Sequence, residues 1–219
     1  TTVPSLYEAV FSGIPNNGIY DFPVGSDQFN LIGNPYPSAI DADLFMTDIN
    51  NASSIDGALY FWTHNTPIQQ SGSEYIYTAD DYATYNRTGG TGTAKGAALS
   101  GGQVPSGKIA SGQSFFVGTA SGIPANSRFQ FKNSMRIIDQ NTQFFKQAST
   151  KKATAIEKNR VWLNLTNSGG AFRQLLVGYI TGATNDWDNL YDGPTFDGQE
   201  FVDFYSVSQG KNLTIQGRA

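Results

Sequence analysis

The stretch VWLNLTNSGGAFRQLLVGYI, residues 161–180, contains the clearest strand signals in the chain. Val161, Leu163 and Leu165 alternate with Trp162 and other side chains at the two-residue period of a β-strand. The Asn-Ser-Gly-Gly sequence that follows is typical of a hairpin turn, and residues 172–180 form a second, longer run. This stretch predicts two antiparallel strands and favours a β-rich fold.

Similar short runs recur along the rest of the chain. One helix is predicted at residues 39–48, because Ser38 and Asp41 have the spacing of an N-terminal capping box. About ten short strands at sandwich-like spacing predict an all-β fold. Besides the two strands above, we expect strands at residues 29–32, 57–62, 75–77, 82–85, 114–117, 128–131, 201–207 and 213–215.

Residues 141–158 interrupt the strand pattern, because Gln, Lys, Ala and Thr dominate them and the apolar periodicity fades. That composition is typical of a linker or a long crossover. We therefore expect two β-sandwich or jelly-roll-like modules, at residues 1–140 and 159–219. Together they account for one short helix and for all the predicted strands.

Composition narrows the classes of function. The 219 residues contain 14 Lys and Arg against 18 Asp and Glu, so no basic surface is expected to neutralise nucleic-acid phosphates. No apolar run approaches the roughly 18 residues of a membrane-spanning helix, so we expect no membrane insertion. The chain has no cysteine, which excludes disulfides, thiolate metal sites and cysteine nucleophiles.

Four aspartates follow the second strand in a Gly-containing loop: Asp186, Asp188, Asp192 and Asp197. Carboxylates that alternate along a loop can surround a hard cation with oxygens, so calcium is the candidate cofactor. Asp186, Asp188 and Asp192 match the two-residue steps of an EF-hand-like loop, which here lacks its glycine and its final glutamate. The alternative is an Asp-rich turn whose side chains bond to their own backbone.

Aromatic residues suggest a ligand surface. Trp187 and Tyr191 are interleaved with the aspartates, and Trp62 ends the 57–62 run. Flat exposed rings beside amides or carboxylates can stack on sugars, so these three are candidate ligand-binding residues for a polysaccharide or another cell-surface ligand. In the competing interpretation the rings pack in the core or across strands. Further candidates of the same kind are Tyr75, Tyr77, Tyr82 and Tyr85.

Signals for catalysis are weak. The only histidine, His64, has no evident catalytic partner, and the chain has no Gly-x-Ser-x-Gly motif. Glycoside hydrolysis needs two carboxyl groups roughly 5–10 Å apart, and Glu200 with Asp203 is the one pairing that the sequence suggests. We therefore expect no enzymatic activity, with a glycan-active hydrolase as an alternative.

Several short motifs also keep their order along most of the chain. With them, the chain resembles the membrane-distal, β-rich modules that precede the C-terminal sorting domain in proteins exported by the type IX secretion system of gliding bacteria. The matching stretches are residues 30–41 (NLIGNPYPSAID), 59–63 (LYFWT), 111–117 (SGQSFFV), 133–136 (NSMR), 162–166 (WLNLT), 188–192 with an aspartate at each end, and 213–217 (LTIQG).

The resemblance implies a secreted, bacterial cell-surface module that meets the type IX machinery during export. It implies an adhesive, glycan-contacting or presentation role with no chemistry of its own. A structural spacer, or a component of secretion and anchoring, is the alternative, because such modules occur in adhesins and in enzymes alike. In that family the chain runs on past the position of Gly217 into further strands, so the resemblance also implies an incomplete second module.

Overall fold

The structure is a computed structural model of the whole chain, and β-strands dominate it. The residues that it describes are 10, 12–63, 69–76, 78–93, 104–141, 158–168, 171–196 and 202–219. Its several sheets and one short α-helix confirm the all-β prediction. Within this described part, no helix is both long and apolar enough to cross a membrane.

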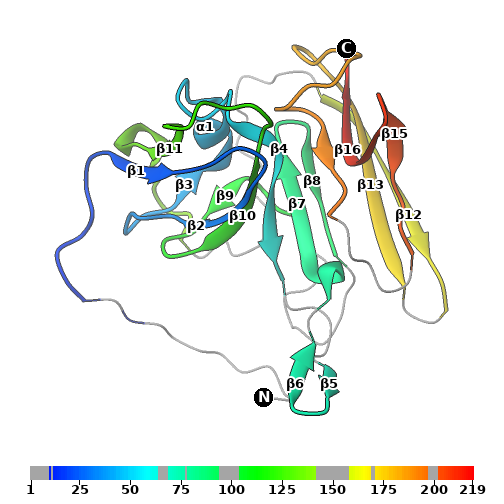
Figure 1. The fold of residues 1–219 in the computed structure, drawn as a ribbon, viewed down its shortest axis with the longest axis horizontal. Coiled ribbons are helices and arrows are strands. Elements are labelled where there is room, and N and C mark those ends of the chain that lie inside the picture. The colour runs from blue at the N-terminus through cyan, green and yellow to red at the C-terminus, as the bar shows by residue number, and fades with distance from the viewer. Residues whose placement is uncertain are drawn as a thin grey trace.

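A five-stranded central sheet forms the middle of the molecule (Figure 1). Every neighbouring pair of its strands is antiparallel, and the register of β10 on β4 shifts between Val117 and Thr119. The predicted strands at 29–32, 57–62, 82–85 and 114–117 all belong to this sheet. Its strands, in spatial order, are β2 (Phe29–Gly33), β10 (Ser114–Thr119), β4 (Ile55–Trp62), β7 (Tyr82–Asn86) and β8 (Gly89–Thr91).

The helix and two strand pairs cover one face of the central sheet. Phe45 from the helix stacks on Phe131 at 4.9 Å between ring centroids and meets the edge of Phe115 at 5.6 Å, so aromatic contacts join the layers. These covering elements are α1 (Ala42–Thr47), β1 (Tyr20–Pro23) with β11 (Arg128–Phe131), β3 (Ile40–Asp41) with β9 (Lys108–Ile109), and the 3-10 turn η2 (Asn133–Met135).

The helix is shorter than the predicted 39–48, because Ile40 and Asp41 pair with β9 instead of entering the helix. Asp41 is its N-cap, and its Oδ1 accepts hydrogen bonds from the backbone N–H groups of Asp43 and Leu44. The predicted capping box is therefore wrong in its position, because Asp41 and not Ser38 is the N-cap. Asp41 also forms an ion pair with Lys108 on β9.

A second sheet contains the C-terminal residues. β12 and β13 form the predicted antiparallel hairpin, with Leu163 opposite Leu175. β16 pairs in parallel with β13, so the chain crosses over between them through the aspartate loop. The strands are β12 (Lys158–Thr166), β13 (Phe172–Ile180), β16 (Lys211–Arg218) and β14 (Gly193–Pro194), with β15 (Ser206–Ser208) paired to β16.

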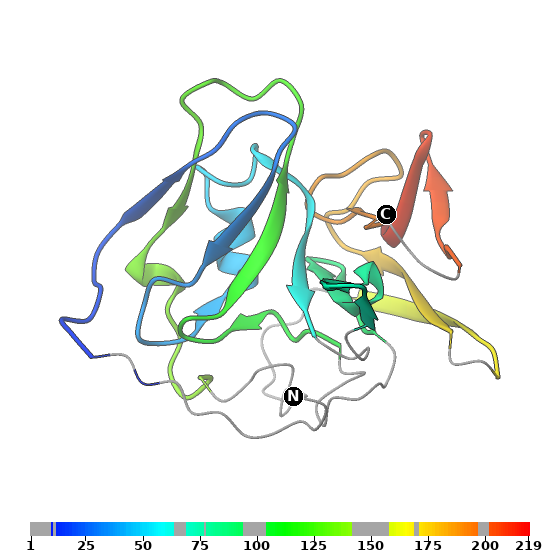
Figure 2. The same ribbon diagram turned by 60° about the horizontal axis from the view of Figure 1, so that its bottom comes forward.

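One face of the second sheet packs on the face of the central sheet that α1 does not cover (Figure 2). The contact is close at Gly57, where an added Cβ would lie 2.5 Å from Pro194 Cδ. The hydroxyl of Tyr60 donates to the carbonyl of Pro194 at 3.1 Å, which links the sheets directly. The described part of the second module is thus a single sheet that uses the central sheet as its other layer.

The remaining elements are small. The predicted linker or crossover at 141–158 falls mostly on residues outside the described part of the chain. A short hairpin and a 3-10 turn precede β7, and the hairpin overlaps the strand predicted at 75–77. These elements are β5 (Gln69–Ser71), β6 (Glu74–Ile76) and η1 (Ala79–Asp81).

Candidate functional site

Asp192 ties the aspartate loop to the second sheet. Its side chain is fully buried, its Oδ1 accepts from Gly217 N and its Oδ2 accepts from Asp188 N, both at 2.9 Å. Burial raises the pKa of the Asp192 carboxyl above its usual value, although the two backbone N–H groups lower it. The side chain therefore acts as an internal brace between the loop and β16.

The other aspartates of the loop point to different partners. Asp188 Oδ1 accepts from Leu190 N at 3.3 Å, and the exposed Asp186 accepts from Gln209 Nε2 at 2.7 Å. Asp197 lies outside the described residues. Within the described ranges, no three carboxylate or histidine side chains gather into a possible metal site. The bonds of Asp188 and Asp192 to backbone N–H groups of the loop match the Asp-rich turn, whereas Asp186 bonds to a side chain outside the loop. Calcium stays a prediction from the sequence.

The two candidate ligand-binding aromatic residues of the aspartate loop, Tyr191 and Trp187, contact cationic side chains of the protein. Tyr191 is buried, and Arg87 donates to its hydroxyl at 2.6 Å while the guanidinium lies 4.8 Å from the ring centroid. Lys211 Nζ lies 3.5 Å from the ring centroid of Trp187. This corrects the expectation for Tyr191, because a buried ring cannot stack on a sugar, and one face of Trp187 carries a cation.

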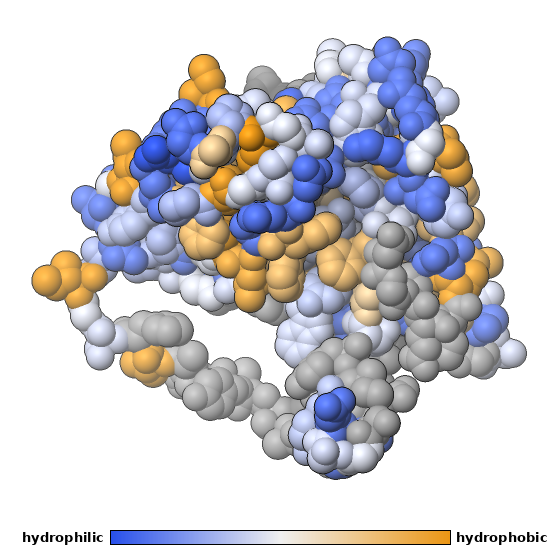
Figure 3. Space-filling model, viewed as in Figure 1, coloured by the Kyte–Doolittle hydropathy of each residue, from blue (hydrophilic) through white to orange (hydrophobic). Residues whose placement is uncertain are grey.

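Trp62, the third predicted residue, is 40% exposed at the end of β4. It lies opposite Tyr82 on the face of the central sheet that looks away from α1. Further apolar side chains line this face along β2 and β10 (Figure 3). We call these residues the apolar patch: Phe29, Leu31, Trp62, Tyr82, Phe116 and Phe196.

Ring contacts join four residues of the apolar patch. Tyr82 stacks on Phe196 with centroids 4.7 Å apart, and Phe116 meets the edge of Tyr82 at 5.8 Å. Phe29 contacts Phe196 at 5.6 Å on the other side. The patch therefore spans β2, β10, β4 and β7, and the segment after β14 supplies Phe196.

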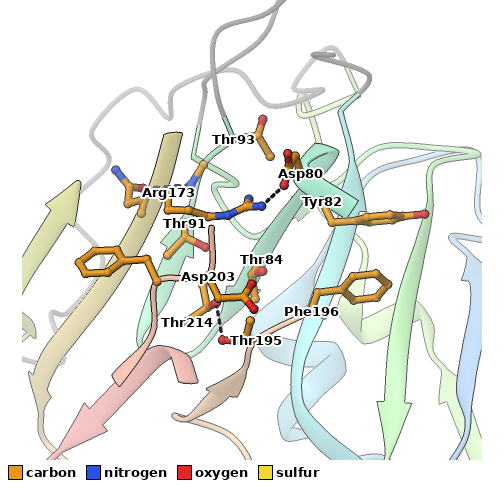
Figure 4. Close-up of a pocket in the computed structure, with 13 residues that line it drawn as sticks. Asp80, Tyr82, Thr84, Thr91, Thr93, Arg173, Thr195, Phe196, Asp203 and Thr214 are labelled. Carbon is orange, nitrogen blue, oxygen red and sulfur yellow. Dashed lines mark hydrogen bonds and ion pairs between the residues drawn. The ribbon is translucent and has the colours of Figure 1, made fainter. Parts of the chain in front are cut away.

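A polar hollow adjoins the patch where the two sheets meet (Figure 4). Its volume of about 30 Å³ has room for a few water molecules but not for a sugar ring. A sugar ring could therefore lie only on the apolar patch, with one of its hydroxyl groups extending into the hollow. The lining residues of the hollow include Asp80, Thr84, Thr91, Arg173, Thr195, Asp203 and Thr214.

An ion pair crosses the hollow. Arg173 on β13 pairs with Asp80 of η1, and both side chains are mostly buried. Arg173 Nε also donates to the carbonyl of Val202 at 3.0 Å. Burial lowers the pKa of Arg173, while the nearby Asp203 raises it. The guanidinium is held by these partners, whereas the exposed Asp203 presents a carboxylate at the mouth of the hollow.

Hydroxyl groups complete the lining of the hollow. The side-chain oxygens of Thr195 and Thr214 lie 3.2 Å apart, and Gln174 Oε1 accepts from the backbone N–H of Gly92 at 3.0 Å. Hydroxyl, amide and carboxylate groups beside aromatic rings are the usual means of orienting a polar ligand. The hollow therefore offers directional hydrogen bonding next to a surface suited to stacking.

The sequence predicted some of the residues that form the apolar patch and the hollow. Trp62 and Tyr82 were candidates, but Arg173 and Phe196 were missed because their partners come from distant parts of the chain. The available signal was a charged residue, Arg173, inside an otherwise apolar strand, since buried charges are normally paired. Of the alternative catalytic pair, Glu200 lies outside the described residues and Asp203 lines the hollow. The residues His64 and Tyr77 also lie outside the described part.

Comparison with known proteins gives one match. The model of a family described as a domain of unknown function, DUF8693, matches residues 1–219. No curated protein and no solved structure matches the chain.

Proposed function

Because the chain belongs to the DUF8693 family, whose description names no activity, we propose a function from its own site. The chain is a glycan-contacting module of an exported bacterial surface protein, with an adhesive or presentation role and no chemistry of its own. The apolar patch is the stacking surface, and the hollow beside it receives ligand hydroxyl groups.

The observation that carries this proposal is the exposure of the apolar patch next to a polar hollow. Phe29 and Leu31 are more than half exposed on β2, the edge strand of the central sheet, and they lie next to the rings of the patch. Contiguous apolar surface rimmed by polar groups is typical of a binding surface in a soluble protein. Trp187 and Tyr191 of the aspartate loop offer no comparable ring surface, because Tyr191 is buried and Trp187 lies against Lys211.

The chemistry of the site favours a carbohydrate with few negative charges. The C–H faces of a sugar can lie on aromatic rings, while its hydroxyl groups bond to threonine and carboxylate oxygens. Arg173 is the cation that lines the hollow, and Asp80 and Val202 already hold its guanidinium. Asp203 adds a negative charge, so we expect neutral polysaccharides to bind better than acidic ones.

Two further features support a non-catalytic surface role. A glycosidase needs two available carboxyl groups across the scissile bond, and in this hollow the Asp80 carboxylate is paired with Arg173. The resemblance to modules exported by the type IX system supports the cell-surface location. A structural spacer within the same class of protein is the alternative, and it predicts no ligand at all.

A glycan array followed by calorimetry tests the proposal. We expect the chain to bind neutral polysaccharide, and Trp62→Ala and Phe29→Ala each to raise Kd about tenfold, or about 1.4 kcal/mol. The matched control is Val207→Ala, because Val207 is also exposed, at 65% against 59% for Phe29, but lies on β15 of the second sheet. Absence of binding across neutral and acidic polysaccharides would reject the proposal and favour the spacer.

A further inference from the structure

β12 is a long strand at the edge of the second sheet, and among the described residues it pairs with β13 alone. Its register on β13 is continuous over all nine residues. Val161, Leu163 and Leu165 are 56%, 46% and 38% exposed. A strand in this position presents a row of backbone N–H and C=O groups that no neighbouring strand satisfies.

The usual protections against edge pairing are weak along this strand. Natural edge strands are short, interrupted by a bulge or proline, or protected by charged side chains. Residues 161–166, VWLNLT, contain no proline, no glycine and no charge. The edge is therefore suited to accept another strand, with apolar side chains expected at alternate positions of that strand.

Three even-numbered side chains of β12, Arg160, Trp162 and Asn164, make contacts within the chain. Trp162 Nε1 donates to the carbonyl of Gly90 at 3.0 Å, and the Arg160 guanidinium lies 5.3 Å from the Trp162 ring. Asn164 accepts from Gln174 Nε2 at 2.9 Å. These contacts hold β12 in place at the rim of the molecule, where Figures 1 and 2 both show it.

We propose that β12 pairs antiparallel with β12 of a second copy of this chain, about a two-fold axis centred on Leu163. A two-fold axis normal to the sheet keeps odd-numbered residues of both copies on one face. Centring on Leu163 places it opposite itself and places Val161 opposite Leu165 of the other copy. By symmetry Leu165 also lies opposite Val161 of the other copy, which gives three apolar pairs. A register centred on residue 162 or 164 would give only two, so the aliphatic side chains select the register.

The same register avoids repulsion between like charges. Arg160 falls opposite Thr166 of the second copy, and Trp162 falls opposite Asn164. The dimer would join the two second sheets edge to edge and satisfy the backbone groups of both edges. The overlap of residues 160–166 is short, about 24 Å, so we expect a small interface whose occupancy depends on concentration. This inference is independent of the proposed glycan site.

Analytical ultracentrifugation of the whole chain tests the pairing. We expect the mass to rise from monomer towards dimer between about 5 and about 500 µM, the range expected for a small interface. Leu163→Lys should keep the chain monomeric, because it places two ammonium groups opposite each other. The matched control is Val207→Lys on β15, which should dimerise like the unmodified chain.

Disulfide trapping tests the register, and the cysteine-free chain makes the result clear. Leu163→Cys should form a covalent dimer under mild oxidation, since directly opposed strand residues lie within disulfide reach. Tyr179→Cys, a more exposed position one strand inward, should not form a covalent dimer. A chain that stays monomeric at all concentrations, or equal trapping at both positions, would overturn the inference.

Discussion

The central sheet and the second sheet are built from similar short apolar strands, yet their surroundings differ. In β4 four successive residues, Ala58, Leu59, Tyr60 and Phe61, are buried, because α1 and the strand pairs cover one face and the second sheet covers the other. In β12 the described side chains are all exposed. Alternation in a sequence identifies which residues share a face, but the topology decides whether that face is buried.

The largest expected effect is the difference in the free energy of unfolding lost when an apolar side chain is removed from each of the two regions. Phe45→Ala should lower the free energy of unfolding by about 3–5 kcal/mol, because it removes a fully buried ring stacked between layers. Leu163→Ala should cost less than about 1 kcal/mol, since nearly half of its side chain is already in water. Urea unfolding of both variants at low protein concentration measures the difference, and equal losses would contradict the comparison.

The next effect concerns the ion pair that joins η1 to the second sheet. Arg173→Ala should destabilise the chain by about 3 kcal/mol, because it leaves the mostly buried Asp80 carboxylate without its partner. Arg128→Ala breaks a half-exposed pair with Asp21 and should cost about 0–1 kcal/mol. Thermal unfolding monitored by circular dichroism distinguishes them. Replacing Asp80 and Arg173 together by leucine should recover most of the loss, and failure to do so would point to a different cause.

A smaller loss of stability is expected when a methyl group is added at Gly57, where the two sheets approach each other closely. Gly57 has φ +87°, and an added Cβ would lie 2.7 Å from the carbonyl oxygen of Asp192 as well as near Pro194. Gly57→Ala should cost about 2 kcal/mol more than Gly122→Ala, a positive-φ position with open space around it, where only the backbone penalty of about 1 kcal/mol applies. Equal losses in urea unfolding would mean that the sheets are less tightly packed at Gly57.

The smallest effect is a difference in pH dependence between Asp192 and Asp48. Burial raises the pKa of Asp192, so the folded state binds the proton more tightly and gains stability as pH falls through the raised pKa towards its usual 3.8. Burial acts on Asp48 in the same direction, but hydrogen bonds from Lys132 and Asn50 give it a net lowered pKa. Asp48 therefore contributes stability above its usual pKa that is lost as pH falls through the lowered value.

Urea unfolding of Asp192→Asn and Asp48→Asn across the acidic range checks these signs. The stability of the unmodified chain relative to Asp192→Asn should increase as pH falls, and its stability relative to Asp48→Asn should decrease. Slopes of the same sign for both variants would contradict the assigned pKa directions.

Local patterns predicted the elements with short-range partners. The hairpin of β12 and β13 followed from alternation and from one turn, and its register places Leu163 opposite Leu175 as two adjacent strands require. The helix was predicted to begin three residues too early, at 39 instead of 42, because cross-strand pairing of Ile40 with Ile109 is a long-range contact. Such contacts depend on the whole topology and leave no periodic signal in the sequence.

The candidate site was predicted only in part for the same reason. The parallel pairing of β16 with β13 buries Asp192 and Tyr191, whose loop composition had suggested exposure. The hollow is made by Asp80 and Arg173, which are distant in sequence and meet only when the second sheet packs on the first. Trp62 was identified at the end of an alternating strand and is 40% exposed there, and its role in ligand binding stays a prediction.

The three tryptophans allow the most direct test of the proposed glycan site, because each has a different environment. Trp62 lies on the apolar patch, Trp162 donates to Gly90, and Trp187 lies under Lys211. Their indole N–H signals can be followed by NMR during titration with the oligosaccharide that binds most tightly on the array. The account predicts that the Trp62 signal shifts while those of Trp162 and Trp187 stay in place. A shift of Trp187 alone, or no shift at saturating oligosaccharide, would contradict it.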